Sequence, residues 1–269
     1  MKIQNIAKSF AVAMVLVGLS SLSVIAQTNS GDKTYEQMSR AERAVFISAQ
    51  MKRISRELSG TEYQLTPEFE QDIQKAVSHY ASRLERSAKH DLRLTLERGR
   101  SHAPTLTAPF RARNLSPLFG LYIPFIESEY KNLESSKPMG SIGMFQFMPK
   151  TGENFGLTPQ DLLDVAKSAD AAARYITNSL ESFKDDPMKE ALAVLSYNRG
   201  VTKTLSAMKI LVNDQNRQCS ICALNADRTK LDEAFNHENV FYVPLFFAAA
   251  IIGENPQAFG LQTPPLSSN

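Results

Sequence analysis

Apolar side chains recur three or four residues apart over much of this chain, and no run of alternating apolar and polar residues indicates a sheet core. The first such segment follows a capping box formed by Ser39 and Glu42, and it stops at Gly60. The second begins at Thr66 and Pro67, where proline is favourable at the first helical position. The pattern therefore predicts an all-α fold whose first elements are amphipathic helices.

A break in the helical pattern is predicted next, because Gly99 is followed by a proline-containing stretch from Pro104 to Pro109. We place a boundary there, between an N-terminal helical region at 27–105 and a main domain at 106–262, with a C-terminal tail at 263–269. Further helices are predicted to start at Ser116-Pro117 and to cover Ser168 to Phe183, Lys189 to Tyr197 and Val240 to Ile252.

The start of the chain has the pattern of an export signal at 1–26. Lys2 and Lys8 precede an apolar core at 10–19, and small residues at 24–26 form a cleavage site, so the mature chain is expected to begin near Gln27. An uncleaved anchor is the alternative, but the apolar core is shorter than the roughly 20 residues of a membrane span. No cysteine that could carry a lipid lies near the cleavage site. We expect an exported protein, periplasmic or associated with the cell wall, without a stable membrane anchor.

The formal net charge of +2 is close to neutral, so the overall charge does not indicate a class of binding partner. Only one segment has a marked excess of charge. Between Arg83 and Arg113 basic residues outnumber acidic ones, which could provide a face for an anionic polymer. A solvated helix face is the better interpretation, because arginine and lysine commonly cover helices without binding anything. No aromatic residues are interleaved with the stripe, which argues against a nucleic-acid partner.

The only cysteines are Cys219 and Cys222. In an exported protein such a pair favours a disulfide, with free thiols as the next alternative and zinc the least favoured, because two further ligands are not evident. A redox role would require a βαβ context that the pattern does not show. We interpret the pair as a local clip in a loop, and we expect no metal and no cofactor.

Glu127 is the strongest candidate for chemistry. It ends an apolar run, and a glycine-containing turn at 140–143 and an apolar segment at 144–148 follow it. Burial against apolar groups raises the pKa of a carboxyl group. A general acid needs such a raised pKa, because it must stay protonated near neutral pH. Pro124 should kink or loosen the helix just before Glu127. By itself a glutamate at a helix end is more often solvated or capping.

Several motifs in a fixed order make the pattern more specific. The motifs are Glu127-Ser128, Ser136, Gly140-x-x-Gly143-x-x-Gln146-x-Met148-Pro149, Ser196-Tyr197-Asn198-x-Gly200 and Glu238-x-x-x-Tyr242-Val243-Pro244. With these motifs, the chain from about Phe110 to Leu261 resembles the lytic transglycosylases of the lysozyme-like superfamily (SLT domain), and neighbouring phrases look most like the membrane-bound lytic murein transglycosylase D branch. The resemblance implies a lysozyme-like catalytic domain behind the amphipathic helices.

The resemblance implies that peptidoglycan is the substrate and that Glu127 is the catalytic residue. In this family one glutamate protonates the oxygen that leaves the N-acetylmuramic acid, and then removes the proton from the C6 hydroxyl of that sugar as a 1,6-anhydro ring closes. No second carboxylate is required, whereas most glycosidases use two. The rival interpretations are a lysozyme-type hydrolase and a wall-binding or assembly protein that has lost turnover.

The other motif positions match residues that line the substrate groove in the family. Their amide and hydroxyl groups suit sugar oxygens, and their methionine and aromatic groups suit sugar rings. These substrate-binding positions are Ser136, Gln146, Met148, Tyr197, Asn198, Glu238 and Tyr242.

Each groove position also has a structural alternative. Met148 and Tyr242 could simply pack in the core. Glu238 could be a charge at a helix N-terminus. Tyr197 and Asn198 could mark the C-terminus of a helix, because asparagine and glycine are common where helices stop.

Overall fold

The computed structural model describes residues 33–85, 91–135 and 140–268, and residues 33–269 cluster as one compact unit. The predicted export signal at 1–26 and the predicted groove residue Ser136 lie outside the described residues. Within the described ranges the secondary structure is helical, and the only β pairing is in isolated bridges that join Leu133 to Gly143 and Ile142 to Phe147. The all-α prediction is confirmed. In the same ranges, no helix has the length and apolar character needed to cross a membrane.

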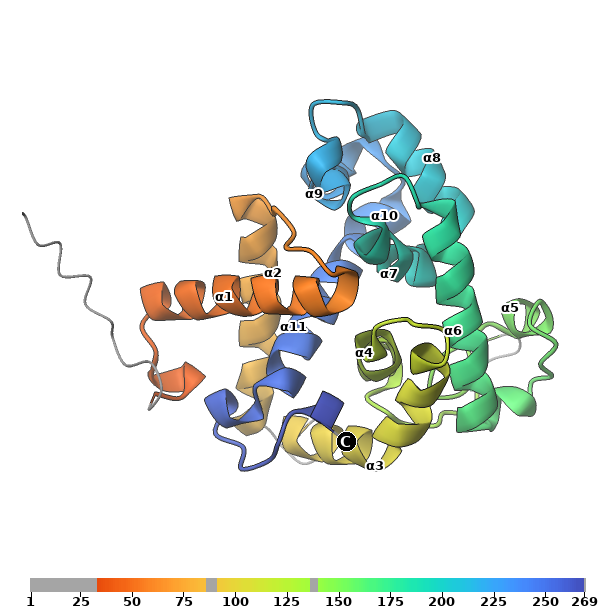
Figure 1. Cartoon of the computed structure of the whole chain (residues 1–269), viewed down its shortest axis with the longest axis horizontal. Helices are drawn as coiled ribbons and strands as arrows, with labels where there is room; N and C mark the ends of the chain where they lie inside the picture. Colours follow the sequence, from red (N-terminus) through yellow and green to blue (C-terminus); the bar gives the residue numbers. More distant parts are fainter. Residues whose placement is uncertain (1–32, 86–90, 136–139, 269) are drawn as a thin grey trace, which may run out of the picture. The chain divides into compact units, whose positions relative to one another are not determined.

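The helices are named in chain order (Figure 1). The α-helices are α1 (Arg40–Ser59), α2 (Pro67–Ala81), α3 (Leu92–Arg111), α4 (Pro117–Ser128), α5 (Pro149–Glu153), α6 (Val165–Ser182), α7 (Lys189–Arg199), α8 (Val201–Leu211), α9 (Ser220–Ala226), α10 (Glu233–His237) and α11 (Tyr242–Glu254). The 3-10 helices are η1 (Tyr35–Gln37), η2 (Ser82–Glu85), η4 (Asp161–Leu163), η5 (Arg217–Cys219), η6 (Arg228–Lys230), η7 (Asn239–Phe241), η8 (Pro256–Phe259) and η9 (Leu266–Ser268).

Helix α11 forms the centre of the core. It is apolar on every face, and all of its residues except Leu245 are buried, as expected of a helix with protein on all sides. It packs against α1, α2, α4 and α7, and Figure 1 shows its blue ribbon beside α1 and α2. Glycine at position 253 allows Tyr122 of α4 to approach closely, because a Cβ there would collide with the Tyr122 ring. The core therefore unites the N-terminal helices with the segment that carries Glu127.

The helix caps explain where the N-terminal helices start and stop. Ser39 and Glu42 form the predicted capping box, and Gly60 ends α1 in the left-handed conformation with φ 81°. Thr66 caps α2, and Pro67 occupies its first position. These predicted boundaries are confirmed.

The predicted break between Gly99 and Pro109 is wrong. Helix α3 runs through it, because one face of that helix is buried along its whole length. Gly99 lies under the ring of Tyr130, where a Cβ would be 2.5 Å from a ring carbon. Each internal proline costs about 3 kcal/mol of helix stability in an isolated helix. In α3 the free energy gained by burying one apolar face is larger than this cost. The division at residues 105 and 106 into a helical region and a catalytic domain stays a prediction.

In the described residues the basic stripe is mixed: Arg93 and Arg111 are exposed, as the solvated-face interpretation expects, whereas other arginines are bound by distant parts of the chain. Arg86 and Lys89 of the stripe lie outside the described residues. Arg83 is buried, with 7% of its surface exposed. The contacts are from Arg83 and Arg98 to Glu129, from Arg113 to Asp170, from Arg100 to the Pro264 carbonyl, and from Arg111 to the Ser267 carbonyl.

Later helix ends differ from the prediction by a few residues. Helix α6 begins at Val165 because Asp164 caps it by accepting hydrogen bonds from the next turn. Helix α11 begins at Tyr242 because a 3-10 turn precedes it. Cys219 and Cys222 form a disulfide, but the loop predicted for them is wrong, since Cys219 ends η5 and Cys222 lies in α9.

Candidate functional site

Helix α4 carries Glu127 on its last turn. Ser116 caps the start of this helix, Pro117 follows at its first position, and the helix continues through Pro124 to Ser128. The Ser128 hydroxyl donates to the Met144 carbonyl at 2.7 Å, which joins the end of α4 to the turn at 140–148. Glu127 is thus placed between a buried helix and this turn.

The Glu127 carboxylate meets Tyr242, the first residue of α11. The Tyr242 hydroxyl donates to Oε1 of Glu127 at 2.6 Å. Burial, together with the charge of Glu238, raises the pKa of Glu127 from 4.5 to about 7, although the hydrogen bond from Tyr242 opposes the rise. Glu127 nevertheless keeps part of its side chain open to solvent. A carboxyl group that holds its proton near pH 7 and can still reach a ligand is suited to general acid catalysis.

Tyr197 of α7 completes the aromatic side of this site. Its hydroxyl donates to the Phe145 carbonyl at 3.0 Å, and its ring packs against Phe147 and Tyr175. Burial raises the pKa of Tyr197, and the nearby charge of Glu127 adds to the rise. The structure therefore brings Tyr197, Tyr242 and Glu127 together, as the order of motifs predicts.

Gln146 holds the turn at 140–148 in shape. Its side-chain oxygen accepts from the Ser141 hydroxyl at 2.6 Å, and its side-chain nitrogen donates to the Gly143 carbonyl at 2.7 Å. Its backbone has φ 51°, which is unfavourable for a residue with a Cβ. Because both ends of its amide have partners within the turn, the described contacts show a structural role, and substrate binding by Gln146 stays a prediction.

Met148 and Glu238 lie at the surface. Met148 is 46% exposed, so the core-packing alternative is wrong for this residue. Glu238 is exposed at the start of η7, where its side chain makes no capping hydrogen bond. Its charge nevertheless raises the pKa of Glu127, so it is a neighbouring carboxylate. Tyr242 differs from both, because it is buried and also hydrogen-bonded to Glu127.

Residues 108–218 match the family model described as transglycosylase SLT domain. The match supports the predicted resemblance to the lytic transglycosylases of the lysozyme-like superfamily, which act on peptidoglycan. No curated protein matches the chain.

The SLT match covers part of the site. It includes α4 with Glu127, the turn with Gln146, and the end of α7 with Tyr197, but it stops before Tyr242 and Glu238. The hydrogen-bond donor to Glu127 therefore comes from a segment beyond the matched residues.

Residues that the sequence analysis did not identify connect Asn198 to the rest of the site. The Asn198 side-chain oxygen accepts from Asn239 at 2.5 Å, and Asn239 accepts in turn from Arg199 at 2.9 Å. Arg199 also pairs with Asp232 at 2.5 Å. Asn198 lies in the last turn of α7, just before Gly200, so the helix-end interpretation also describes it. Only proximity to the motifs in the sequence could have suggested Arg199 and Asn239.

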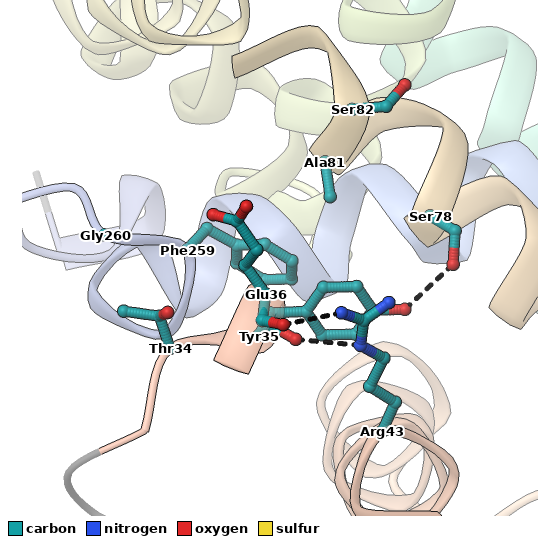
Figure 2. Close-up of a pocket in the computed structure, with 9 residues that line it drawn as sticks. All are labelled: Thr34, Tyr35, Glu36, Arg43, Ser78, Ala81, Ser82, Phe259 and Gly260. Carbon is teal, nitrogen blue, oxygen red and sulfur yellow. Dashed lines mark hydrogen bonds between the residues drawn. The ribbon is translucent and has the colours of Figure 1, made fainter. Parts of the chain in front are cut away.

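A separate cavity of about 290 Å³ lies beside η1, α2 and η8 (Figure 2). Its polar groups bind one another: Arg43 donates to the carbonyls of Tyr35 and Glu36, and the Tyr35 hydroxyl lies 3.0 Å from that of Ser78. None of the residues that line it belongs to the site around Glu127. In the described part of the chain no group of histidine, cysteine and acidic side chains could hold a metal ion.

Proposed function

We propose that this protein is an exported peptidoglycan lytic transglycosylase that cleaves the β-1,4 bond between N-acetylmuramic acid and N-acetylglucosamine. The observation that carries the proposal is Glu127, a carboxyl group with a pKa of about 7 inside the SLT match. A leaving sugar oxygen is a poor leaving group unless it is protonated, and a buried acid supplies the proton. The export-signal pattern at 1–26 supports export. The membrane-bound lytic murein transglycosylase D branch is supported by the phrases Phe110-Arg111-Ala112-Arg113-Asn114-Leu115, Phe155-Gly156-Leu157 and Asn255-Pro256.

Glu127 performs both proton transfers in the proposed reaction. Its proton goes to the glycosidic oxygen as the bond from C1 to that oxygen breaks. The resulting carboxylate then accepts the proton of the C6 hydroxyl while C6–O attacks C1, which closes the 1,6-anhydro ring without consuming water. The Tyr242 hydroxyl stays protonated, because burial and the charge of Glu127 raise its pKa, so it can stabilise the carboxylate between the two steps.

The groove residues bind the glycan in this proposal. Tyr197 supplies a ring face near the acid, Asn198 an amide held by Asn239, and exposed Met148 an apolar surface for a sugar ring. The same function is assigned, from the resemblance, to Ser136, Gln146, Glu238 and Tyr242.

The products of digestion test the proposal. We expect sacculi digested by the purified protein to yield muropeptides with 1,6-anhydro ends, identified by mass spectrometry. Reducing ends that borohydride can label would instead identify a hydrolase. No soluble product at all would favour a wall-binding protein without turnover.

A lysozyme-type hydrolase is the second candidate, and one observation favours it. Glu238 is a carboxylate close enough to raise the pKa of Glu127, and most glycosidases pair an acid with a second carboxylate. In a hydrolase Glu238→Gln would remove the base or nucleophile and abolish turnover. In a transglycosylase the same change weakens glycan binding but does not abolish turnover, because the C6 hydroxyl is the nucleophile in place of that group.

Tyr242→Phe is expected to extend activity to higher pH. The Tyr242 hydrogen bond lowers the pKa of Glu127, so its removal raises that pKa above about 7. An acid must be protonated to donate, so activity is lost as pH rises through this pKa, and the loss should occur at higher pH in the variant. The measurement is the pH dependence of sacculus solubilisation. Tyr175→Phe, which removes a hydroxyl bonded to the Ser196 carbonyl, is the matched control and should leave the midpoint unchanged. A lower midpoint in Tyr242→Phe would contradict the assignment.

A further inference from the structure

The turn that follows Glu127 has an unusual backbone. Glu129 and Tyr130 are both left-handed, with φ 53° and 59°, although neither is glycine. Side chains with a Cβ disfavour this region, so two such residues in succession must be held by their surroundings.

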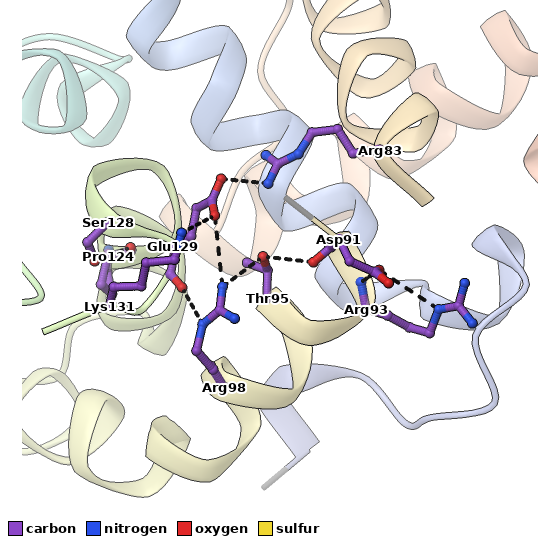
Figure 3. A network of polar contacts seen from close by, with 9 residues as sticks. All are labelled: Arg83, Asp91, Arg93, Thr95, Arg98, Pro124, Ser128, Glu129 and Lys131. Carbon is purple, nitrogen blue, oxygen red and sulfur yellow. Dashed lines mark hydrogen bonds and ion pairs between the residues drawn. The ribbon is translucent and has the colours of Figure 1, made fainter. Parts of the chain in front are cut away.

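The Glu129 carboxylate is the centre of a polar network (Figure 3). It lies 2.5 Å from Nη2 of Arg83, 2.9 Å from Nζ of Lys131 and 3.8 Å from Nη2 of Arg98. Arg98 also donates from Nε to the Glu129 backbone carbonyl at 3.0 Å. The side chain and the backbone of the first left-handed residue are therefore both bound.

The second left-handed residue is fixed by packing. The Tyr130 ring is 2% exposed and lies over Gly99, where no Cβ could fit. Its hydroxyl donates to the Leu121 carbonyl at 2.8 Å, and this hydrogen bond links the turn to the middle of α4. Glu129 and Tyr130 together thus connect the end of α4 to α3 and η2.

The ion pair of Glu129 with Arg83 is shielded from solvent, unlike most of the surface pairs. The Arg83 side chain is 9% exposed and that of Glu129 is 20% exposed. Burial opposes ionisation of Glu129, but Lys131 and Arg83 lower its pKa overall, so it carries its charge. A pair in this environment is screened less than an exposed one.

Both arginines come from outside the SLT match. Arg83 belongs to η2 and Arg98 to α3, whereas the match begins at residue 108. Side chains that precede the matched region therefore reach the residue that lies two positions after Glu127.

We propose that Glu129, held by Arg83 and Arg98, is a positioning residue that fixes the last turn of α4 so that Glu127 stays against Tyr242. The inference rests on the proposed function, because it assigns Glu127 to the reaction. Glu127 and Glu129 share one helix end, so a turn that relaxes rotates the Glu127 side chain away from the Tyr242 hydroxyl and from the scissile oxygen. A displacement of about 1 Å at a reacting group can reduce a rate about 100-fold.

The first test is Glu129→Gln, which keeps the size of the side chain and removes its charge. Full-length protein should lose at least about tenfold in kcat on solubilised glycan strands, with KM within about twofold of the parent. Glu181→Gln is the matched control, because it removes an exposed ion pair between Glu181 of α6 and Lys184 and should leave both constants unchanged. An unchanged kcat in Glu129→Gln would overturn the inference.

A double variant separates positioning from stability. Glu129→Gln alone leaves a buried arginine with fewer partners and can destabilise the fold, whereas Arg83→Met with Glu129→Gln removes both charges and should restore the Tm. We expect kcat to remain low in the double variant. Recovery of kcat together with Tm would show that the ion pair only stabilises the protein.

A titration tests the inference without turnover. In protein with ¹³C-labelled glutamate carboxyl groups, Tyr242→Phe should raise the pKa of Glu127 in the parent. In the Glu129→Gln background it should change that pKa little, because the contact is already lost. Equal shifts in both backgrounds would overturn the inference. If the parent forms no anhydro ends, the proposed function fails, and this titration still decides whether Glu129 positions Glu127.

Discussion

Glu127→Gln is expected to reduce the release of soluble muropeptides from sacculi by at least about 1,000-fold. General acid and base catalysis each contribute about 100-fold to 10,000-fold, and Glu127 has both functions in the proposed reaction. Glutamine keeps the size of the side chain and can still accept from Tyr242, but its amide N–H is far too weak an acid to protonate the glycosidic oxygen. The measurement is the initial rate of muropeptide release, followed by chromatography.

The control for this variant is Glu153→Gln. Glu153 is an exposed glutamate at the end of α5, inside the SLT match, and its loss should leave the rate unchanged. Glu127→Gln should keep the Tm of the parent or exceed it, because a neutral amide replaces a group whose charge is disfavoured by burial. Unchanged lysis by Glu127→Gln would remove this residue from the mechanism.

Gly143→Ala is expected to destabilise the protein by about 4 kcal/mol. The φ of 81° disfavours any Cβ by about 1–2 kcal/mol, and a Cβ built there would also collide with the Leu162 carbonyl. That neighbour is backbone, so it cannot turn away as a flexible side chain would, and the turn that contains Gln146 must move. The measurement is the free energy of unfolding from urea denaturation.

Gly156→Ala is the matched control for the collision. Gly156 has φ 77°, but nothing lies within 4 Å of its added Cβ. Its replacement should therefore cost only the conformational penalty, about 1–2 kcal/mol. If both variants lose the same stability, the contact between Gly143 and Leu162 is not the cause.

Local signals in the sequence predicted the helices well where caps and periodicity agree. Ser39, Gly60, Thr66 and Pro67 fix helix ends by short-range contacts that one segment contains by itself. The predicted break before α4 was wrong because Gly99 and the prolines were interpreted locally. The burial that keeps α3 continuous depends on Tyr130 and other distant residues.

Signals in the sequence predicted part of the candidate site, but not the contacts between distant residues. The apolar neighbours of Glu127 indicate a raised pKa, and the resemblance to the family predicts that Tyr242 lies in the groove. The hydrogen bond between them joins residues 115 positions apart, and no local pattern specifies it. Glu129, Arg199 and Asn239 were missed because their importance comes from partners on other helices.

Because α11 is central to the core, its position in the chain sets the stage of synthesis at which the site around Glu127 can form. Synthesis proceeds from the N-terminus, so α4 and its glutamate are made long before α11. Until α11 is available, α2 and α4 lack the helix on which they pack, and Glu127 lacks its hydrogen-bond donor. In a partly made chain the Glu127 carboxyl group is therefore not buried and has an ordinary pKa. We expect the chain to cut glycan only after α11 has docked.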